Sequence, residues 1–267
     1  MATNSWTGGA NDGNWSTPGN WSLGAIPVDT NDVIISAGAM DITTMPSVIP
    51  PTGTLASFTV GPGFKGSIGG SSGGSANISA TVVSVSMGGA AIFFGTGTRT
   101  TVNIDGTGRG AAFITAGTNT TINVGLGASL DIGGTAVYTT LNSAGRVNDA
   151  NGTAATTCNI GAGVYRTYRS VSALNLGSGA VAQYLLTASI STSAKIEGSA
   201  RLNWQSSGVL SGLTLMPNST FDVEGCLYSF SITGTLTQWA GSSYNTAGIG
   251  IAVTDSGATK VFIGKRS

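Results

Sequence analysis

The chain has 267 residues, of which 42 are glycine and only 8% are charged, and its formal net charge is zero. Mean hydropathy is +0.23 and β-branched residues recur along the whole chain, which excludes intrinsic disorder. The 11 basic residues are too few to form the positive stripe that binds nucleic acid, and no apolar run approaches the ~20 residues of a membrane-spanning helix, so neither nucleic-acid binding nor membrane insertion is expected.

Residues 1–32 form the first predicted segment, which is rich in tryptophan and in turn residues. The segment has neither a basic start nor an apolar run, so it does not have the pattern of a secretory signal, and synthesis in the cytoplasm is expected. We expect it to cover the end of the strands that follow. The residues expected to form this structural cap are Trp6, Trp15, Asn20, Trp21 and Pro27.

Residues 33–245 form the second predicted segment, in which a short pattern of apolar residue, asparagine and apolar residue recurs. The asparagines are Asn103, Asn123, Asn142, Asn159 and Asn175, spaced 20, 19, 17 and 16 residues apart. A drifting period of this length predicts a β-solenoid, in which each turn supplies one copy of the same strand. Because strand side chains alternate between faces, the flanking apolar residues point inward, and each asparagine either lies in an outward ladder or fills a turn.

Residues 246–267 form the last predicted segment. Residues 249–253 and 260–263 have strand character and flank Asp255, Ser256 and Gly257, a sequence typical of a β-hairpin turn. The predicted fold is therefore all-β, a single-chain parallel β-helix with a tryptophan-rich N-terminal cap and a C-terminal hairpin cap.

Residues 6–35 resemble the entry segment at the start of β-helical repeats in autotransporter-type passengers and related bacterial and phage surface proteins. The spacing is W-x8-W-x4-N-W, and the matching residues are Trp6, Gly13, Trp15, Asn20, Trp21, Gly24, Pro27, Asp32, Val33 and Ile35. The resemblance implies a parallel β-helix with an extracellular or virion role, and it implies no chemistry. The chain departs from the autotransporter pattern in its missing signal sequence and membrane-barrel strands, which favours a phage structural protein.

The chain contains no histidine, so catalytic triads and histidine-ligated metals are not expected. No catalytic, metal or cofactor-binding residues are predicted. The remaining enzymatic alternative is glycan hydrolysis or lysis, as in a tailspike, by the carboxylates of Asp222 and Glu224 with Glu197 on a neighbouring turn. Solvated charges on the sheet surface are the competing interpretation.

Aromatic residues concentrate in the second half of the chain. They either anchor an interface, where they could also stack on sugars, or fill the core. The candidate interface residues are Tyr165, Tyr168, Tyr184, Trp204, Tyr228 and Trp239.

The favoured function is a non-enzymatic structural protein of a phage virion, either a capsid decoration protein or a short fibre. A chain with so little charge lacks the self-repulsion that keeps proteins apart, which favours assembly. The expected partners are two further copies in a homotrimer, phage capsid or tail proteins, and a host-surface glycan, and the expected location is the virion. A secreted or surface adhesin is the alternative.

Overall fold

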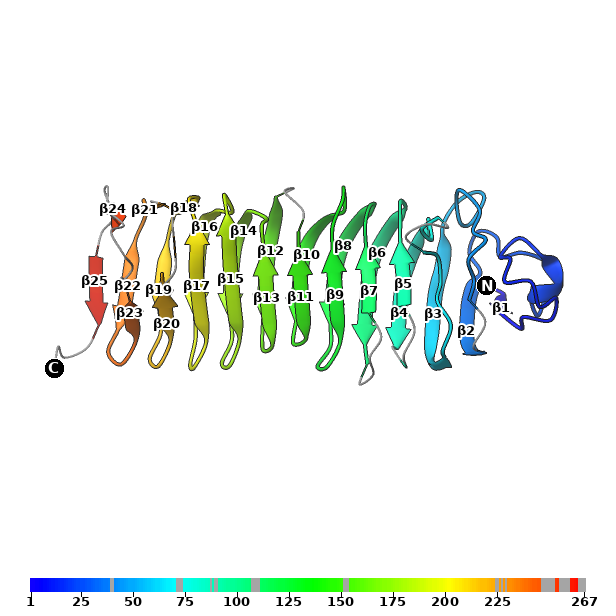
Figure 1. The fold of residues 1–267 in the computed structure, drawn as a ribbon, viewed down its shortest axis with the longest axis horizontal. Helices are drawn as coiled ribbons and strands as arrows, with labels where there is room; N and C mark the ends of the chain where they lie inside the picture. Colours follow the sequence, from blue (N-terminus) through cyan, green and yellow to red (C-terminus); the bar gives the residue numbers. More distant parts are fainter. Residues whose placement is uncertain are drawn as a thin grey trace. The chain divides into compact units, whose positions relative to one another are not determined.

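The computed structural model describes residues 1–38, 41–70, 74–86, 88, 91–106, 111–150, 154–223, 226, 228, 230–245, 253–254 and 260–263 (Figure 1). Strands hold 56% of the chain and helix 1%, and the strands wind into a parallel β-solenoid, which confirms the predicted fold class. The chain divides into two compact units, Met1–Tyr138 and Thr139–Ser267.

The first unit contains two parallel sheets, in which each strand pairs with the equivalent strand of the next turn. A short 3-10 helix, Pro18–Asn20, lies in its N-terminal segment. The strands of one sheet are β1 (Thr3–Ser5), β2 (Asp32–Gly38), β3 (Leu55–Phe64), β4 (Ala80–Ser86), β6 (Thr98–Asp105) and β8 (Thr118–Val124). The strands of the other are β5 (Ala91–Phe94), β7 (Ala111–Ile114) and β9 (Ser129–Ile132).

The second unit repeats this plan. One sheet contains β10 (Val137–Ser143, which begins two residues before the unit), β12 (Ala155–Ile160), β14 (Val171–Leu176), β16 (Ile190–Ile196), β18 (Val209–Leu210), β19 (Leu213–Leu215), β21 (Phe230–Ile232), β22 (Leu236–Trp239), β24 (Val253–Thr254) and β25 (Lys260–Ile263). The other contains β11 (Arg146–Asp149), β13 (Val164–Thr167), β15 (Val181–Leu186), β17 (Arg201–Ser206), β20 (Thr220–Asp222) and β23 (Ser243–Asn245).

The apolar residues of the repeated pattern form the core, as predicted. On β6 and β8, Val102 lies beside Ile122 and Ile104 beside Val124, and all four side chains are buried. On β12 and β14 the equivalent residues, including Ile160, Leu174 and Leu176, are buried in the same way. Each strand therefore buries alternate residues against identical positions of its neighbours, and this stacking is the hydrophobic contact that holds successive turns together.

The asparagines of the pattern form outward ladders, which settles the alternative between a ladder and a turn. In the first unit, the side-chain amide of Asn123 donates to Oδ1 of Asn103 at 2.8 Å. In the second unit, Asn159 donates to Asn142 at 2.9 Å and Asn175 donates to Asn159 at 2.8 Å. Because each amide both donates and accepts, a column of asparagines satisfies itself from one turn to the next.

A buried ion pair lies in the second unit. Nε of Arg169 is 2.9 Å from Oδ2 of Asp149, and both side chains are fully shielded from solvent. The hydroxyl of Tyr165 also donates to this carboxylate, at 3.4 Å. Asp149 ends β11, and it faces the core because Val147, two residues earlier, is also buried there.

The predicted C-terminal hairpin is wrong for the strands that the structure describes. β24 pairs in parallel with β21, and β25 pairs in parallel with β22, so both continue the solenoid. The unpaired edge of each preceding strand offers backbone donors and acceptors that the next strand occupies. The turn residues Asp255, Ser256 and Gly257 lie outside the described residues.

We predict that the buried ion pair is a strongly coupled unit. Arg169→Leu should lower the free energy of unfolding by about 3–5 kcal/mol, because the Asp149 carboxylate then remains buried without its cation. The double variant Asp149→Asn/Arg169→Leu should lose clearly less than the sum of the two single variants. Chemical denaturation of the four proteins measures both quantities, and additive losses would contradict the predicted coupling.

Candidate functional site

The three N-terminal tryptophans form one cluster. The rings of Trp6 and Trp21 meet edge to face with centroids 5.0 Å apart, and those of Trp15 and Trp21 do so at 4.6 Å. Trp15 also lies 6.2 Å from the ring of Phe58 on β3, and Nε1 of Trp21 donates to the carbonyl of Trp15 at 2.8 Å. All three indoles are buried, so this segment packs directly on the apolar interior of the first unit.

Asn20 connects the loops of this cap. Its side-chain Nδ2 donates to Oδ1 of Asp12 at 2.6 Å and to the carbonyl of Asn14 at 2.9 Å, while its Oδ1 accepts from the backbone N–H of Ala10 at 2.9 Å. The asparagine is fully buried, and Pro27 is buried as well. The cap is thus held by a satisfied polar network around an aromatic cluster.

Asp12 is a further member of this network. Its carboxylate accepts hydrogen bonds from the hydroxyl of Thr17, the backbone N–H of Asn14 and the amide of Asn20, in that order of effect. These bonds favour the charged form and lower the pKa of Asp12 below its ordinary value of 3.8. In the sequence, Asp12 has only the character of a turn residue.

Three of the predicted interface aromatics lie in the core, so their assignment to an interface is wrong. Tyr165, Tyr184 and Trp204 are fully buried, and the rings of Tyr184 and Trp204 stack with centroids 5.3 Å apart and an interplanar angle of 11°. Tyr184 and Trp204 occupy equivalent positions on β15 and β17, in an inward-facing column of the sheet. The competing interpretation, core filling, describes these three residues.

The other three predicted interface aromatics have exposed surface. Tyr228 is exposed, and Tyr168 and Trp239 are half-buried. Nη2 of Arg166 donates to the hydroxyl of Tyr168 at 3.2 Å, and the guanidinium lies 5.8 Å from the centre of the same ring. Tyr168 is therefore held against its neighbour on β13.

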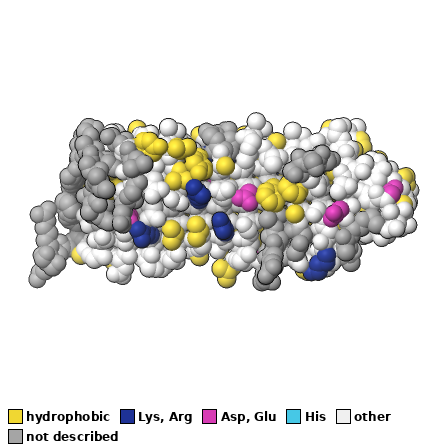
Figure 2. All heavy atoms as spheres, in the orientation of Figure 1, with side chains coloured by type: hydrophobic (Ala, Val, Ile, Leu, Met, Phe, Trp, Pro, Cys, Tyr) yellow, Lys and Arg dark blue, Asp and Glu magenta, His cyan; other side chains and the backbone are white. Residues whose placement is uncertain are grey.

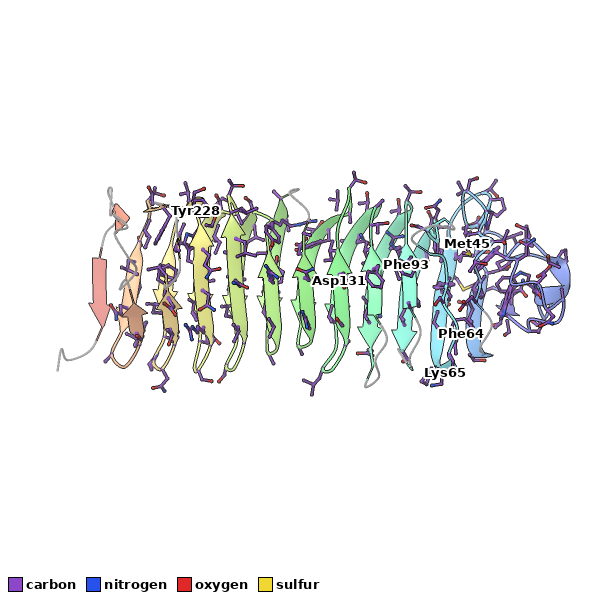
Figure 3. All side chains as sticks on the ribbon, viewed as in Figure 1. Met45, Phe64, Lys65, Phe93, Asp131 and Tyr228 are labelled. Carbon is purple, nitrogen blue, oxygen red and sulfur yellow. The ribbon has the colours of Figure 1, made fainter. Side chains whose placement is uncertain are left out.

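Tyr228 belongs to an exposed apolar group that we call the leucine–tyrosine corner, formed by Leu186, Val209 and Tyr228. The exposed fractions of these side chains are 50%, 40% and 41%. Leu186 ends β15, and its carbonyl accepts from the N–H of Ser207, two residues before Val209. Val209 pairs with Ser231, which follows Tyr228 by three residues, so the three side chains come from consecutive turns. Figure 2 shows hydrophobic side chains gathered in the region where Figure 3 labels Tyr228.

Leu186 has an unusual backbone conformation, with a φ of 58°. Leucine rarely adopts the left-handed region, which costs about 1–2 kcal/mol. The corner thus holds an exposed apolar side chain on a strained backbone. The sequence carries no signal for this feature, because Leu186 follows Leu185 in an ordinary strand pattern.

A second outward aromatic group lies in the first unit. Phe93 on β5 and Phe113 on β7 stack with centroids 4.6 Å apart at 5°, and Asp131 on β9 takes the next position of the row (Figure 3). Because the two rings cover each other's faces, this pair stabilises adjacent turns and leaves mainly ring edges exposed.

The carboxylates weighed for glycan cleavage do not converge where the structure describes them. Asp222 pairs with Arg201 on the sheet of β17 and β20, while Glu197 follows β16 in the other sheet and pairs with Lys195. Glu224 lies outside the described residues. Within the described part of the chain, no group of three or more His, Cys, Asp or Glu side chains is placed to hold a metal ion.

Comparisons of the chain with protein-family models, with curated proteins and with solved structures found no match. Among the described residues, no helix has the length and apolar character needed to span a membrane. Function is therefore inferred from the residues of this chain alone.

We predict that the tryptophan cluster is a major source of stability for the first unit. Trp21→Ala should lower the free energy of unfolding by about 3–5 kcal/mol, because it removes a buried indole and its contacts with two others. Leu23→Ala, in the same segment but with 55% of its side chain exposed, should change it by less than about 0.5 kcal/mol. Equal unfolding transitions for Trp21→Ala and the parent would show that the cap is an independent arm.

The cap should also depend on pH through Asp12. Because folding lowers its pKa, the stabilising effect of the carboxylate is complete above about pH 4, the unfolded value, and is lost as pH falls through the folded pKa. Unfolding temperatures measured at pH 7 and pH 3 should therefore differ less for Asp12→Asn than for the parent. The same pH dependence in both proteins would contradict the proposed contribution of the Asp12 carboxylate to the stability of the cap.

Proposed function

We propose that the protein is a non-enzymatic structural component of a phage virion, a decoration or fibre protein that assembles as a homotrimer through the leucine–tyrosine corner. The observation that carries the proposal is the exposed, strained Leu186, together with the exposed Val209 and Tyr228 on the following turns. When a partner covers solvent-exposed apolar side chains on successive turns, their burial stabilises the complex.

The strain at Leu186 supports an interface at this corner. A left-handed leucine is retained only where the surrounding structure imposes it or where function compensates its cost. Here the carbonyl of Leu186 is held by the N–H of Ser207 and by the hydroxyls of Ser206 and Ser207. These bonds fix the backbone at Leu186, so the side chain leaves the surface from a defined position, which reduces the ordering that a partner would have to impose on binding.

The charges of the second unit support contact by shape rather than by electrostatic attraction. Lys195 pairs with Glu197 and Arg201 pairs with Asp222, so four charged groups are neutralised within the chain. With a net charge of zero as well, the surface offers little long-range field to steer a partner. Multivalent contact of several subunits with one particle then supplies the avidity of a decoration protein.

The self-association is tested by light scattering after size-exclusion chromatography. The parent should have three times the 26.5 kDa chain mass, and Leu186→Asp and Tyr228→Asp should each shift it toward the monomer, because a carboxylate would be buried in the interface. The matched control is Leu126→Asp, a leucine with 77% exposure in the first unit, which should leave the mass unchanged. A parent that is monomeric at all concentrations would contradict the homotrimer.

Attachment to the particle is tested with virions purified from the phage that encodes the chain. Cosedimentation in 0.1 M and 1 M salt should retain the protein equally, because screening to roughly 3 Å at 1 M weakens charge-steered contacts and spares apolar ones. Release of the protein at 1 M salt, or its absence from the virions, would contradict the proposed role.

A further inference from the structure

A hollow of about 260 Å³ lies on the outer face of the second unit, at the ends of β12, β14 and β16. The hollow shares no residue with the leucine–tyrosine corner. A binding function of the hollow is therefore independent of the proposed role in assembly. Its volume is slightly below the ~300–1,000 Å³ of most small-molecule pockets, which is room for a single ring.

Two glycines create the hollow. Gly161 and Gly177 follow β12 and β14 directly, after the buried Ile160 and Leu176, and both line the hollow. A Cβ added at Gly161 would meet only the carbonyl oxygen of Ser143, at 3.9 Å, so the space above this residue is open. A Cβ added at Gly177 would lie 2.8 Å from the carbonyl oxygen of Gly161, so this second glycine allows the close approach of the two backbones. The equivalent position on the next turn is Glu197, whose side chain bounds the hollow at that end.

The long wall of the hollow is a row of polar side chains. Asn159, Asn175 and Lys195 are in register on β12, β14 and β16, two residues before the positions that form the floor. Asn175 donates to Asn159, and Lys195 pairs with Glu197, so the wall presents an amide column that ends in a neutral ion pair. Both members of the pair are about half exposed, with 48% of each side chain accessible.

We propose that this hollow binds one neutral pyranose unit of a glycan. A pyranose ring has a C–H face, which fits the backbone floor at Gly161 and Gly177, and a hydroxyl edge, which fits the polar wall. Lys195 supplies donors and Glu197 supplies acceptors at neighbouring positions, so two adjacent hydroxyls bind in a complementary way, one accepting and one donating. An acidic sugar fits less well, because Lys195 is already neutralised by Glu197, so the wall offers no net positive charge to compensate the desolvation of a carboxylate.

Saturation-transfer difference NMR of the full chain tests the proposal, with the methyl glycosides of glucose, galactose and mannose as neutral probes and glucuronate as the acidic probe. At least one neutral glycoside should bind with a Kd of about 1 mM, the affinity that a ligand of this size reaches, and glucuronate should bind at least tenfold more weakly. No transfer to any neutral glycoside, or stronger transfer to glucuronate, would overturn the proposal.

Three variants locate the binding. Gly161→Leu fills the hollow and Glu197→Ala removes its end wall and acceptor, so each should weaken binding at least tenfold. The control is Gly133→Leu, which adds the same side chain at an equally open glycine directly after β9 in the first unit and should bind as the parent does. Glu197 is exposed enough that its replacement does not threaten folding. Unchanged binding by Gly161→Leu and Glu197→Ala would overturn the assignment to the hollow.

Discussion

The parallel register between consecutive turns is the constraint on which the rest of the structure depends. Along the paired strands that the structure describes, a residue lies beside its equivalent in the next turn, roughly 4.8 Å away, so each strand position becomes a column of side chains. A column is stable only if its members tolerate close contact with their own kind. Asparagine does so through hydrogen bonds between side-chain amides, which run from Asn175 to Asn159 and from Asn159 to Asn142. Aromatic rings do so by stacking, as in Tyr184 and Trp204.

The same register limits where charged side chains can lie. Like charges in one column would repel at short distance, and few positions accept them. In the interior of the second unit, Asp149 and Arg169 form a charged pair of opposite signs. Outside, Lys195 and Glu197 pair within one turn, while Arg201 pairs with Asp222 on the next. A neutral, polar surface follows from the fold, and it suits binding by shape, both at the leucine–tyrosine corner and in the hollow.

The fold was predictable from sequence because the columns leave a visible period. The apolar–Asn–apolar pattern gives both the strand and its inward residues, and the three N-terminal tryptophans identify the cap. The aromatics were less predictable, because a shift of one residue in the assumed strand position exchanges inside and outside. Tyr165 and Tyr184 therefore could not be separated from Tyr168 and Tyr228 by sequence. The left-handed Leu186 has no sequence signal, and the hollow depends on two glycines that lie beside each other only because of the register. The hairpin prediction failed because local turn residues do not report the pairing edge that the previous turn offers.

The register is tested most directly by the energetic coupling between Asn159 and Asn175. Asn159→Ala, Asn175→Ala and the double variant form a thermodynamic cycle, and the hydrogen bond between the two amides predicts a coupling of about 0.5–1 kcal/mol. The same cycle for Asn159 and Gln183, which lies on β15 in the other sheet, should give additive losses. Additive losses for Asn159 and Asn175 as well would contradict the stacked register.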